Sequence, residues 1–298
     1  MSVFSSPSFS RRQVLGALSA TGVASMLAAC GDSSTFEPLV PTRFVSFGDG
    51  WSDLGQTGSR YTVNDSSVNI WVQQLAASYS KTITAQASGG LGYAQGGSRV
   101  NTGANSMADQ ITSFLGSNTI GASDVLVLDA GVSEIIALAS ALTGTALNTA
   151  TDAAGKALAV QARRLTAAGC KHLVVANAMD VGKTPYALTP NRTAELSAAT
   201  RAFNDALKIA LADVTNSMLL IDNEAFVNLV YNSPSSYLGT GALNSPAACT
   251  PAVNTNTCNA ASAVSNYNSY LFADDRHPTP AAHRSIGDNA ASKVKARW

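Results

Sequence analysis

Short apolar runs alternate along this chain with longer stretches whose apolar residues recur every three or four positions. The short runs predict buried strands, and the periodic stretches predict helices packed on a sheet. The predicted strands lie around Val45 and Phe47 and at Thr82–Ala85, Asp124–Asp129, His172–Ala176 and Met218–Asp222. The predicted helices lie at Val68–Tyr79, Met107–Leu115, Glu134–Leu142, Ala150–Ala168, Thr193–Val214 and Glu224–Val230, with a last helix that ends near Lys293. This alternation predicts one α/β domain, a three-layer α/β/α sandwich with a mostly parallel five-stranded sheet.

Two stretches of the domain lack such periodicity. Residues Ser88–Ser98 are too rich in glycine for the interior of a helix or strand and predict a loop. Residues Ser233–Tyr267 are rich in Ser, Asn, Pro and Gly, which predicts a second loop. This loop is long for a compact domain, so we expect it to be functional or to cover part of the surface.

The first thirty residues are expected to be an export signal and not part of the fold. The segment from Ser10 to Leu15, with Arg11 and Arg12, resembles a twin-arginine signal, and an apolar stretch follows that is too short for a comfortable membrane span. Residues 27–30 end in Cys30 and resemble a lipobox. We therefore expect export, cleavage before Cys30 and lipid attachment to its sulfur; the alternative is a plain secretory signal with an incidental cysteine.

The segment after Cys30 indicates where the protein is held. Gly31 stands where the usual inner-membrane retention signal has Asp, so we expect a lipid anchor in the outer membrane, facing the periplasm or the exterior, or a secreted protein. Residues 31–42 are polar with two prolines and are typical of a tether. Residues 43–298 form the expected domain.

Composition and cysteine usage narrow the function classes. The formal net charge is +0, only 13% of residues are charged and no long basic run is present, so we expect no nucleic-acid partner. Cys249 and Cys258 flank a short loop and could form a disulfide in an oxidising compartment, whereas Cys170 is expected to be a lone buried thiol. The spacing of His and Cys residues predicts no metal site, and we expect no cofactor. We also expect that the protein contacts the membrane only through its lipid and that it is a monomer.

Candidate chemistry begins at the stretch from Phe44 to Gly55, FVSFGDGWSDLG. The predicted strand is broken by glycines at 48 and 50, and Trp51 begins a segment that could open a helix with Ser52 or Asp53 as its N-cap. A strand, a tight turn and a helix at the carboxyl edge of an α/β sheet are a common place for a nucleophile.

A second candidate lies near the C-terminus. Asp274 and His277 stand three residues apart before Pro278 and Thr279, which predict a turn and the start of a helix. That spacing lets the carboxylate accept a hydrogen bond from one imidazole nitrogen while the other points into a cleft. The alternative is a helix-capping Asp beside a surface His. His172 and His283 are expected to be inert.

These two blocks resemble the opening FGDSxSDxG and closing D-x-x-H-P-T motifs of the GDSL, or SGNH, family of serine esterases and lipases. The resemblance covers nearly all of residues 43–298 and implies a flavodoxin-like α/β/α fold in which Asp274 orients His277 as general base. It also implies an oxyanion pocket at Gly97, or at Gly96, with Ser133 at the place of a family asparagine. A Rossmann domain is excluded because no GxGxxG turn follows the first predicted strand. An α/β-hydrolase is excluded because the G-x-S-x-G motif is missing.

The main departure from the family is Gly50, which stands where the nucleophilic serine is expected. Four explanations stay open: Ser52 replaces the nucleophile, His277 activates water directly, the protein no longer hydrolyses anything, or the codon is engineered or misread. The expected function is hydrolysis of carboxylic esters in an acylated small molecule or glycan. The alternative is a catalytically silent binding or envelope protein with the same fold.

Overall fold

The computed structural model describes residues 37–65, 69–214, 216–250 and 256–298. The chain divides into two units, and the described residues lie almost entirely in the second, Leu39–Arg297. The expected export signal, Cys30 and most of the tether lie outside the described residues. Everything below concerns the second unit.

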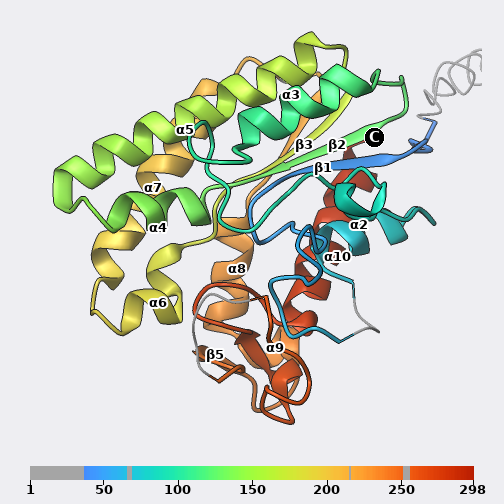
Figure 1. The fold of residues 1–298 in the computed structure, drawn as a ribbon. Helices are drawn as coiled ribbons and strands as arrows, with labels where there is room; N and C mark the ends of the chain where they lie inside the picture. The colour runs from blue at the N-terminus through green and yellow to red at the C-terminus, as the bar shows by residue number, and fades with distance from the viewer. Residues whose placement is uncertain (1–36, 66–68, 215, 251–255) are drawn as a thin grey trace, which may run out of the picture. The chain divides into compact units, whose positions relative to one another are not determined.

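The core of this unit is a parallel sheet in the order β1-β2-β3-β4 (Figure 1). Its strands are β1 (Phe44–Gly48), β2 (Val125–Asp129), β3 (His172–Ala176) and β4 (Met218–Ile221). The residues of β1 and β2 are all buried because helices cover both faces of the sheet. Gly48 pairs with Asp129, so the chain segments that follow β1 and β2 leave the sheet at the same edge. Four of the five predicted strands are thus confirmed.

The strand predicted over Thr82–Ala85 is wrong. The segment Leu91–Gln95, expected to be loop, runs beside β1 instead: Ser46 N–H donates to Leu91 O (3.1 Å), and Tyr93 N–H donates to Ser46 O (2.7 Å). Gly92 sits close to the backbone of Thr84, where a Cβ would be 3.0 Å from the carbonyl oxygen. Glycine suits this close approach, because a Cβ would also overlap with the end of the Leu54 side chain. Because Gly92 has no side chain, a search for apolar side chains did not detect this edge segment.

Helices lie on both faces of the sheet, which confirms the three-layer architecture (Figure 1). Helix α5 packs against α3, α4 and α7, and helix α10 packs against α2 and α8. The α-helices are α2 (Trp71–Ala77), α3 (Met107–Ser117), α4 (Val132–Ala139), α5 (Gly144–Ala167), α6 (Pro185–Leu188), α7 (Thr193–Ala210), α8 (Asn223–Asn232), α9 (Pro234–Leu238) and α10 (Pro280–Arg297). Short 3₁₀ turns are η1 (Gln86–Ser88), η2 (Val181–Lys183) and η3 (Tyr267–Ser269). In the ranges that the structure describes, none of the helices combines the length and apolarity needed to span a bilayer.

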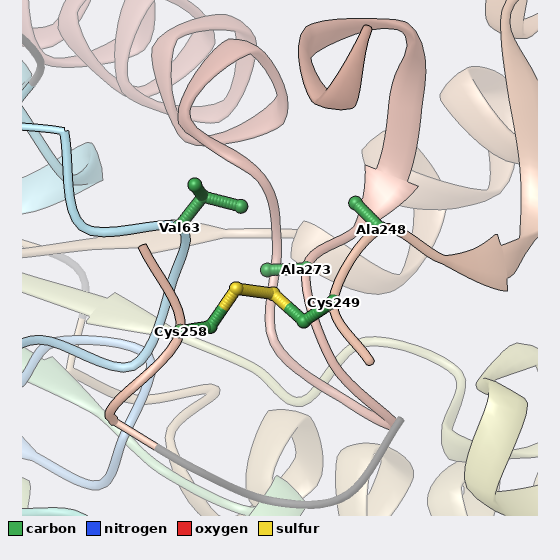
Figure 2. Packing of buried hydrophobic residues seen from close by; sticks show 5 residues of the cluster. All are labelled: Val63, Ala248, Cys249, Cys258 and Ala273. Carbon is green, nitrogen blue, oxygen red and sulfur yellow. A yellow bond between two sulfur atoms is a disulfide. The ribbon is translucent and has the colours of Figure 1, made fainter. Parts of the chain in front are cut away.

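The long segment expected to be loop carries structure of its own. It contains α9 and β5 (Leu243–Ala247), which pairs with β6 (Tyr270–Phe272). The predicted disulfide between Cys249 and Cys258 is present, and Cys170 is a buried free thiol. Both half-cystines pack with Val63, Ala248 and Ala273 in a small buried cluster (Figure 2). This cluster joins the segment that follows the opening turn to the strand that precedes His277.

Candidate active site

The turn after β1 is built around two buried carboxylates and not around a helix. Asp49 accepts hydrogen bonds from Trp51 N–H (3.1 Å) and Ser133 N–H (2.9 Å). The helix predicted to open at Trp51 is absent, because Asp53 instead accepts from the N–H groups of Gly55 (2.8 Å) and Gln56 (2.9 Å), which closes a turn. The turn leaves Gly50 buried at the carboxyl end of β1.

His277 points directly at Gly50. A Cβ placed on Gly50 would overlap with His277 Nε2 and would lie 3.1 Å from Cδ2 and 3.3 Å from Cε1 of the ring. The imidazole is 2% exposed, so it fills the space that a side chain at position 50 would need. The structure therefore brings together the predicted base and the predicted nucleophile position.

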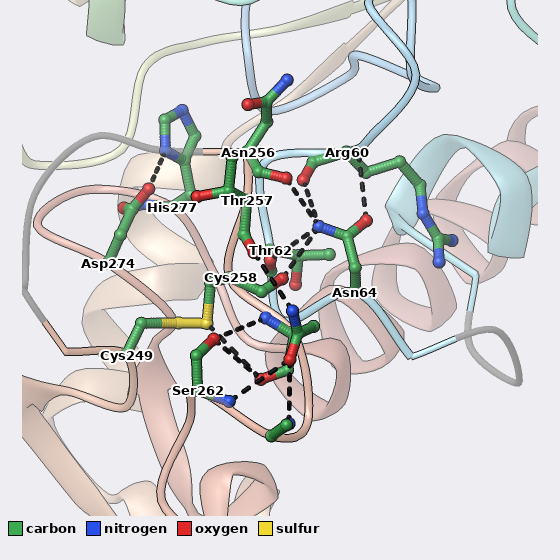
Figure 3. The surroundings of a disulfide bond; sticks show 12 residues. Arg60, Thr62, Asn64, Cys249, Asn256, Thr257, Cys258, Ser262, Asp274 and His277 are labelled. Atoms are coloured by element: carbon green, nitrogen blue, oxygen red, sulfur yellow. Dashed lines mark hydrogen bonds and ion pairs between the residues drawn. A yellow bond between two sulfur atoms is a disulfide. The ribbon is translucent and has the colours of Figure 1, made fainter.

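Asp274 holds the other side of that imidazole (Figure 3). Its Oδ2 lies 2.8 Å from His277 Nδ1, and its Oδ1 accepts the N–H groups of Arg276 (2.8 Å) and His277 (2.7 Å). Burial acts to raise the pKa of Asp274, but the charge and hydrogen bond of His277 and these two N–H groups hold the pKa below its ordinary value. The carboxylate stays ionised and fixes the ring with Nε2 toward Gly50.

The two glycines considered for the oxyanion pocket differ in their bonding. Gly96 N–H donates to Asp53 Oδ2 at 2.8 Å and is therefore occupied. Gly97 is exposed with φ +78°, and within the described ranges neither its N–H nor that of Gly50 donates to a protein acceptor. Two backbone donors are thus free to bind a negatively charged oxygen, and this geometry favours Gly97 over Gly96.

Ser133 does not supply a third donor in this geometry. Its backbone N–H is bonded to Asp49, and the Ser133 side chain also lowers the pKa of that carboxylate. Burial nevertheless keeps the pKa of Asp49 above its ordinary value. Both the backbone and the side chain of Ser133 thus act on the buried carboxylate of Asp49.

Ser52 is also committed to a buried network. Its hydroxyl is fully buried, donates to Asp129 Oδ2 (2.7 Å) and accepts from Trp71 Nε1 (3.0 Å). Burial and the charge of Asp49 raise the pKa of Asp129 to about 8. Among the described residues the Ser52 hydroxyl bonds to Asp129 and Trp71 and not to His277, which argues against its replacing the missing serine.

Sequence reasoning missed two aromatic residues that complete the site. Trp51 Nε1 donates to Arg276 O (3.2 Å), which ties the opening turn to the residue before His277. The ring of Tyr61 lies 4.9 Å from the His277 ring, centroid to centroid. No periodic or motif signal marks Tyr61, because its role depends on a contact between distant segments. Across the described parts of the chain, the structure groups no three His, Cys, Asp or Glu residues that could hold a metal ion.

The profile described as "GDSL-like Lipase/Acylhydrolase" matches residues 29–290. The chain belongs to this family. A crystal structure described as a member of the lipolytic protein G-D-S-L family from Veillonella parvula DSM 2008 is 14% identical, has a TM-score of 0.50, and is matched over 86% of this chain and 99% of that chain. A second solved chain has a TM-score of 0.48 at 17% identity, matched over 87% of this chain and 99% of its own. A search among curated proteins found no match. Membership in the GDSL family confirms the resemblance and places the chain in a hydrolase family.

Proposed function

We propose that this GDSL-family protein hydrolyses carboxylic esters, with His277 acting on water as general base. The observation that carries the proposal is the buried Asp274–His277 pair, 2.8 Å apart, whose Nε2 faces the turn at Gly50. Burial of such a pair lowers the free energy of unfolding unless both groups are hydrogen-bonded, as they are here. The substrate class is an ester of an acylated small molecule or glycan.

The proposed step needs no side chain at position 50. Nε2 of His277 takes a proton from water as its oxygen bonds to the ester carbonyl carbon, and the N–H groups of Gly50 and Gly97 bind the resulting oxyanion. The intermediate collapses to the carboxylic acid, and the imidazolium returns the proton to the departing alkoxide. Asp274 stabilises the imidazolium through Nδ1–H. Loss of a serine nucleophile typically costs about 10⁶ in turnover, so hydrolysis should be slow.

The test is hydrolysis of p-nitrophenyl acetate and butyrate by the purified protein. His277→Ala should abolish turnover, and Asp274→Asn should lower it by about 10²–10⁴, because the imidazole loses its orienting acceptor. His172→Ala is the matched control, since His172 lies at the start of β3 and outside the site. Turnover that does not depend on His277 would contradict the proposal.

A catalytically silent binding protein is the second candidate. It is favoured by Gly50, which has no reactive oxygen, and by Ser133, which stands at the place of the family asparagine. It predicts binding of an acylated ligand, no reaction with fluorophosphonate probes and no turnover. Turnover that is lost in His277→Ala would eliminate this candidate.

We also propose that the protein is exported by the twin-arginine route, lipidated on Cys30 and held at the cell envelope as a monomer. The motif at residues 10–15 supports the export route, and the lipobox at residues 27–30 supports lipid attachment. Metabolic labelling with an alkyne fatty acid should tag the wild type and not Cys30→Ser. Equal labelling of both proteins would contradict lipid attachment at this cysteine.

A further inference from the structure

Tyr61 lies beside His277 on one side and beside Gly96 on the other. Its ring is tilted by 42° against the His277 ring at 4.9 Å. Its other neighbour is Gly96, where an added Cβ would overlap with the phenol ring and its oxygen. The phenol therefore lies beside both the base and the loop that carries Gly97.

The hydroxyl of Tyr61 is available as a donor. It is bonded to no acceptor in the parts of the chain that the structure describes, and the residue is partly exposed. Burial and the charges of Asp53 and Asp274 raise the pKa of Tyr61 above its ordinary value of 10.0, so the O–H keeps its proton at neutral pH. A protonated, partly exposed phenol beside a general base can donate to a ligand oxygen.

The segment around Tyr61 is held rigidly against the turn of His277. Thr62 Oγ1 donates to Pro278 O (2.8 Å). The Asn64 side-chain amide donates to the carbonyls of Arg60, Asn256 and Cys258, each at 2.9 Å (Figure 3). Asn64 N–H also donates to Cys258 O (2.8 Å), next to the disulfide. A donor on a fixed segment is pre-organised, which is the condition for effective stabilisation of charge.

We propose that Tyr61 is a functional side chain of this site and that its O–H donates to a carboxyl oxygen of the bound ester or of the carboxylate product. It supplies a side-chain donor next to His277, whereas the Ser133 side chain acts on Asp49, whose pKa it lowers. This inference rests on the proposed ester-binding function but does not require turnover, because the same hydrogen bond forms with a bound carboxylate.

The test compares Tyr61→Phe with Tyr237→Phe, which makes the same chemical change at a tyrosine packed on Phe226. Sodium butyrate is titrated into each protein while the imidazole signals of His277 are followed by NMR, and kcat and KM are measured with p-nitrophenyl butyrate. Tyr61→Phe should weaken butyrate binding roughly tenfold, as expected for one lost hydrogen bond to a charged oxygen. It should also lower kcat more than it changes KM, while Tyr237→Phe matches the wild type.

The outcomes separate this inference from the proposed hydrolysis. Butyrate binding that is weakened in Tyr61→Phe supports the inference even if the wild type shows no turnover. Turnover and butyrate binding that are equal in Tyr61→Phe and wild type would overturn it and leave the hydrolase proposal standing. No change of the His277 signals by butyrate in the wild type would also overturn it, because there would be no bound oxygen to accept from Tyr61.

Discussion

Replacing Gly50 by serine would return a hydroxyl to the place at which His277 points. The φ angle of Gly50 lies outside the left-handed region, so the backbone accepts an L side chain. The obstacle is the imidazole, which a Cβ would meet at Nε2, at Cδ2 (3.1 Å) and at Cε1 (3.3 Å). The ring must move away by up to about one ångström. After that shift, a serine Oγ and His277 Nε2 can lie at hydrogen-bond distance from each other.

Two effects of different size follow from that shift. Crowding a buried site costs about 1–3 kcal/mol of unfolding free energy, partly offset by about 0.4–1 kcal/mol from the lower chain entropy of a non-glycine residue. The gain in turnover is larger. A restored nucleophile can raise turnover by up to about 10⁶-fold, and the lack of an asparagine at position 133 reduces that gain by a factor of about 10²–10³. Gly50→Ser should therefore be slightly less stable and much more active.

Gly50→Ala is the matched control because it adds the same Cβ without the oxygen. Fluorophosphonate labelling read by intact mass should appear in Gly50→Ser and be absent from Gly50→Ala and the wild type. The double variant Gly50→Ser/Ser133→Asn should hydrolyse p-nitrophenyl butyrate faster than Gly50→Ser. If neither serine variant reacts while both remain folded, Nε2 does not face a usable nucleophile position and the geometric reasoning fails.

The remaining predictions concern stability. Asp129 has a pKa of about 8 when folded and an ordinary value of 3.8, so the folded state holds the extra proton between these values and stability should fall as pH rises from about 4 to 8. In urea unfolding, Asp129→Asn should reduce the difference in unfolding free energy between pH 5 and pH 8. An unchanged difference would mean that other groups cause the pH dependence. Replacing both Cys249 and Cys258 by serine should cost about 2–3 kcal/mol, since the disulfide closes a short loop with a sequence separation of 9. A variant with wild-type stability under oxidising conditions would show that the loop is held by other contacts. Trp51→Phe should cost about 1 kcal/mol by removing the bond to Arg276 O, and no change in thermal unfolding would rule out that bond as a stabiliser.

Local patterns were sufficient for the layered fold. The apolar runs of β1 to β4 identified strands because each is buried against helices and neighbouring strands. The edge segment Leu91–Gln95 was not recognised from the pattern, because its pairing with β1 is made by backbone groups and its central residue, Gly92, has no side chain.

The site divides in the same way between local and distant contacts. The sequence alone determined the Asp274–His277 pair, because two residues three positions apart on one turn meet through local backbone geometry. Only the tertiary structure decided that Nε2 fills the place of a Gly50 side chain, that Ser52 bonds to Asp129, and that Tyr61 lies against the base. These contacts join segments that are far apart in the sequence, as does the bond from Trp51 to Arg276 across 225 residues. They depend on the parallel register that brings β1 and β2 to one edge. No local periodicity encodes such a meeting, because it is set by how the whole sheet and its helices pack.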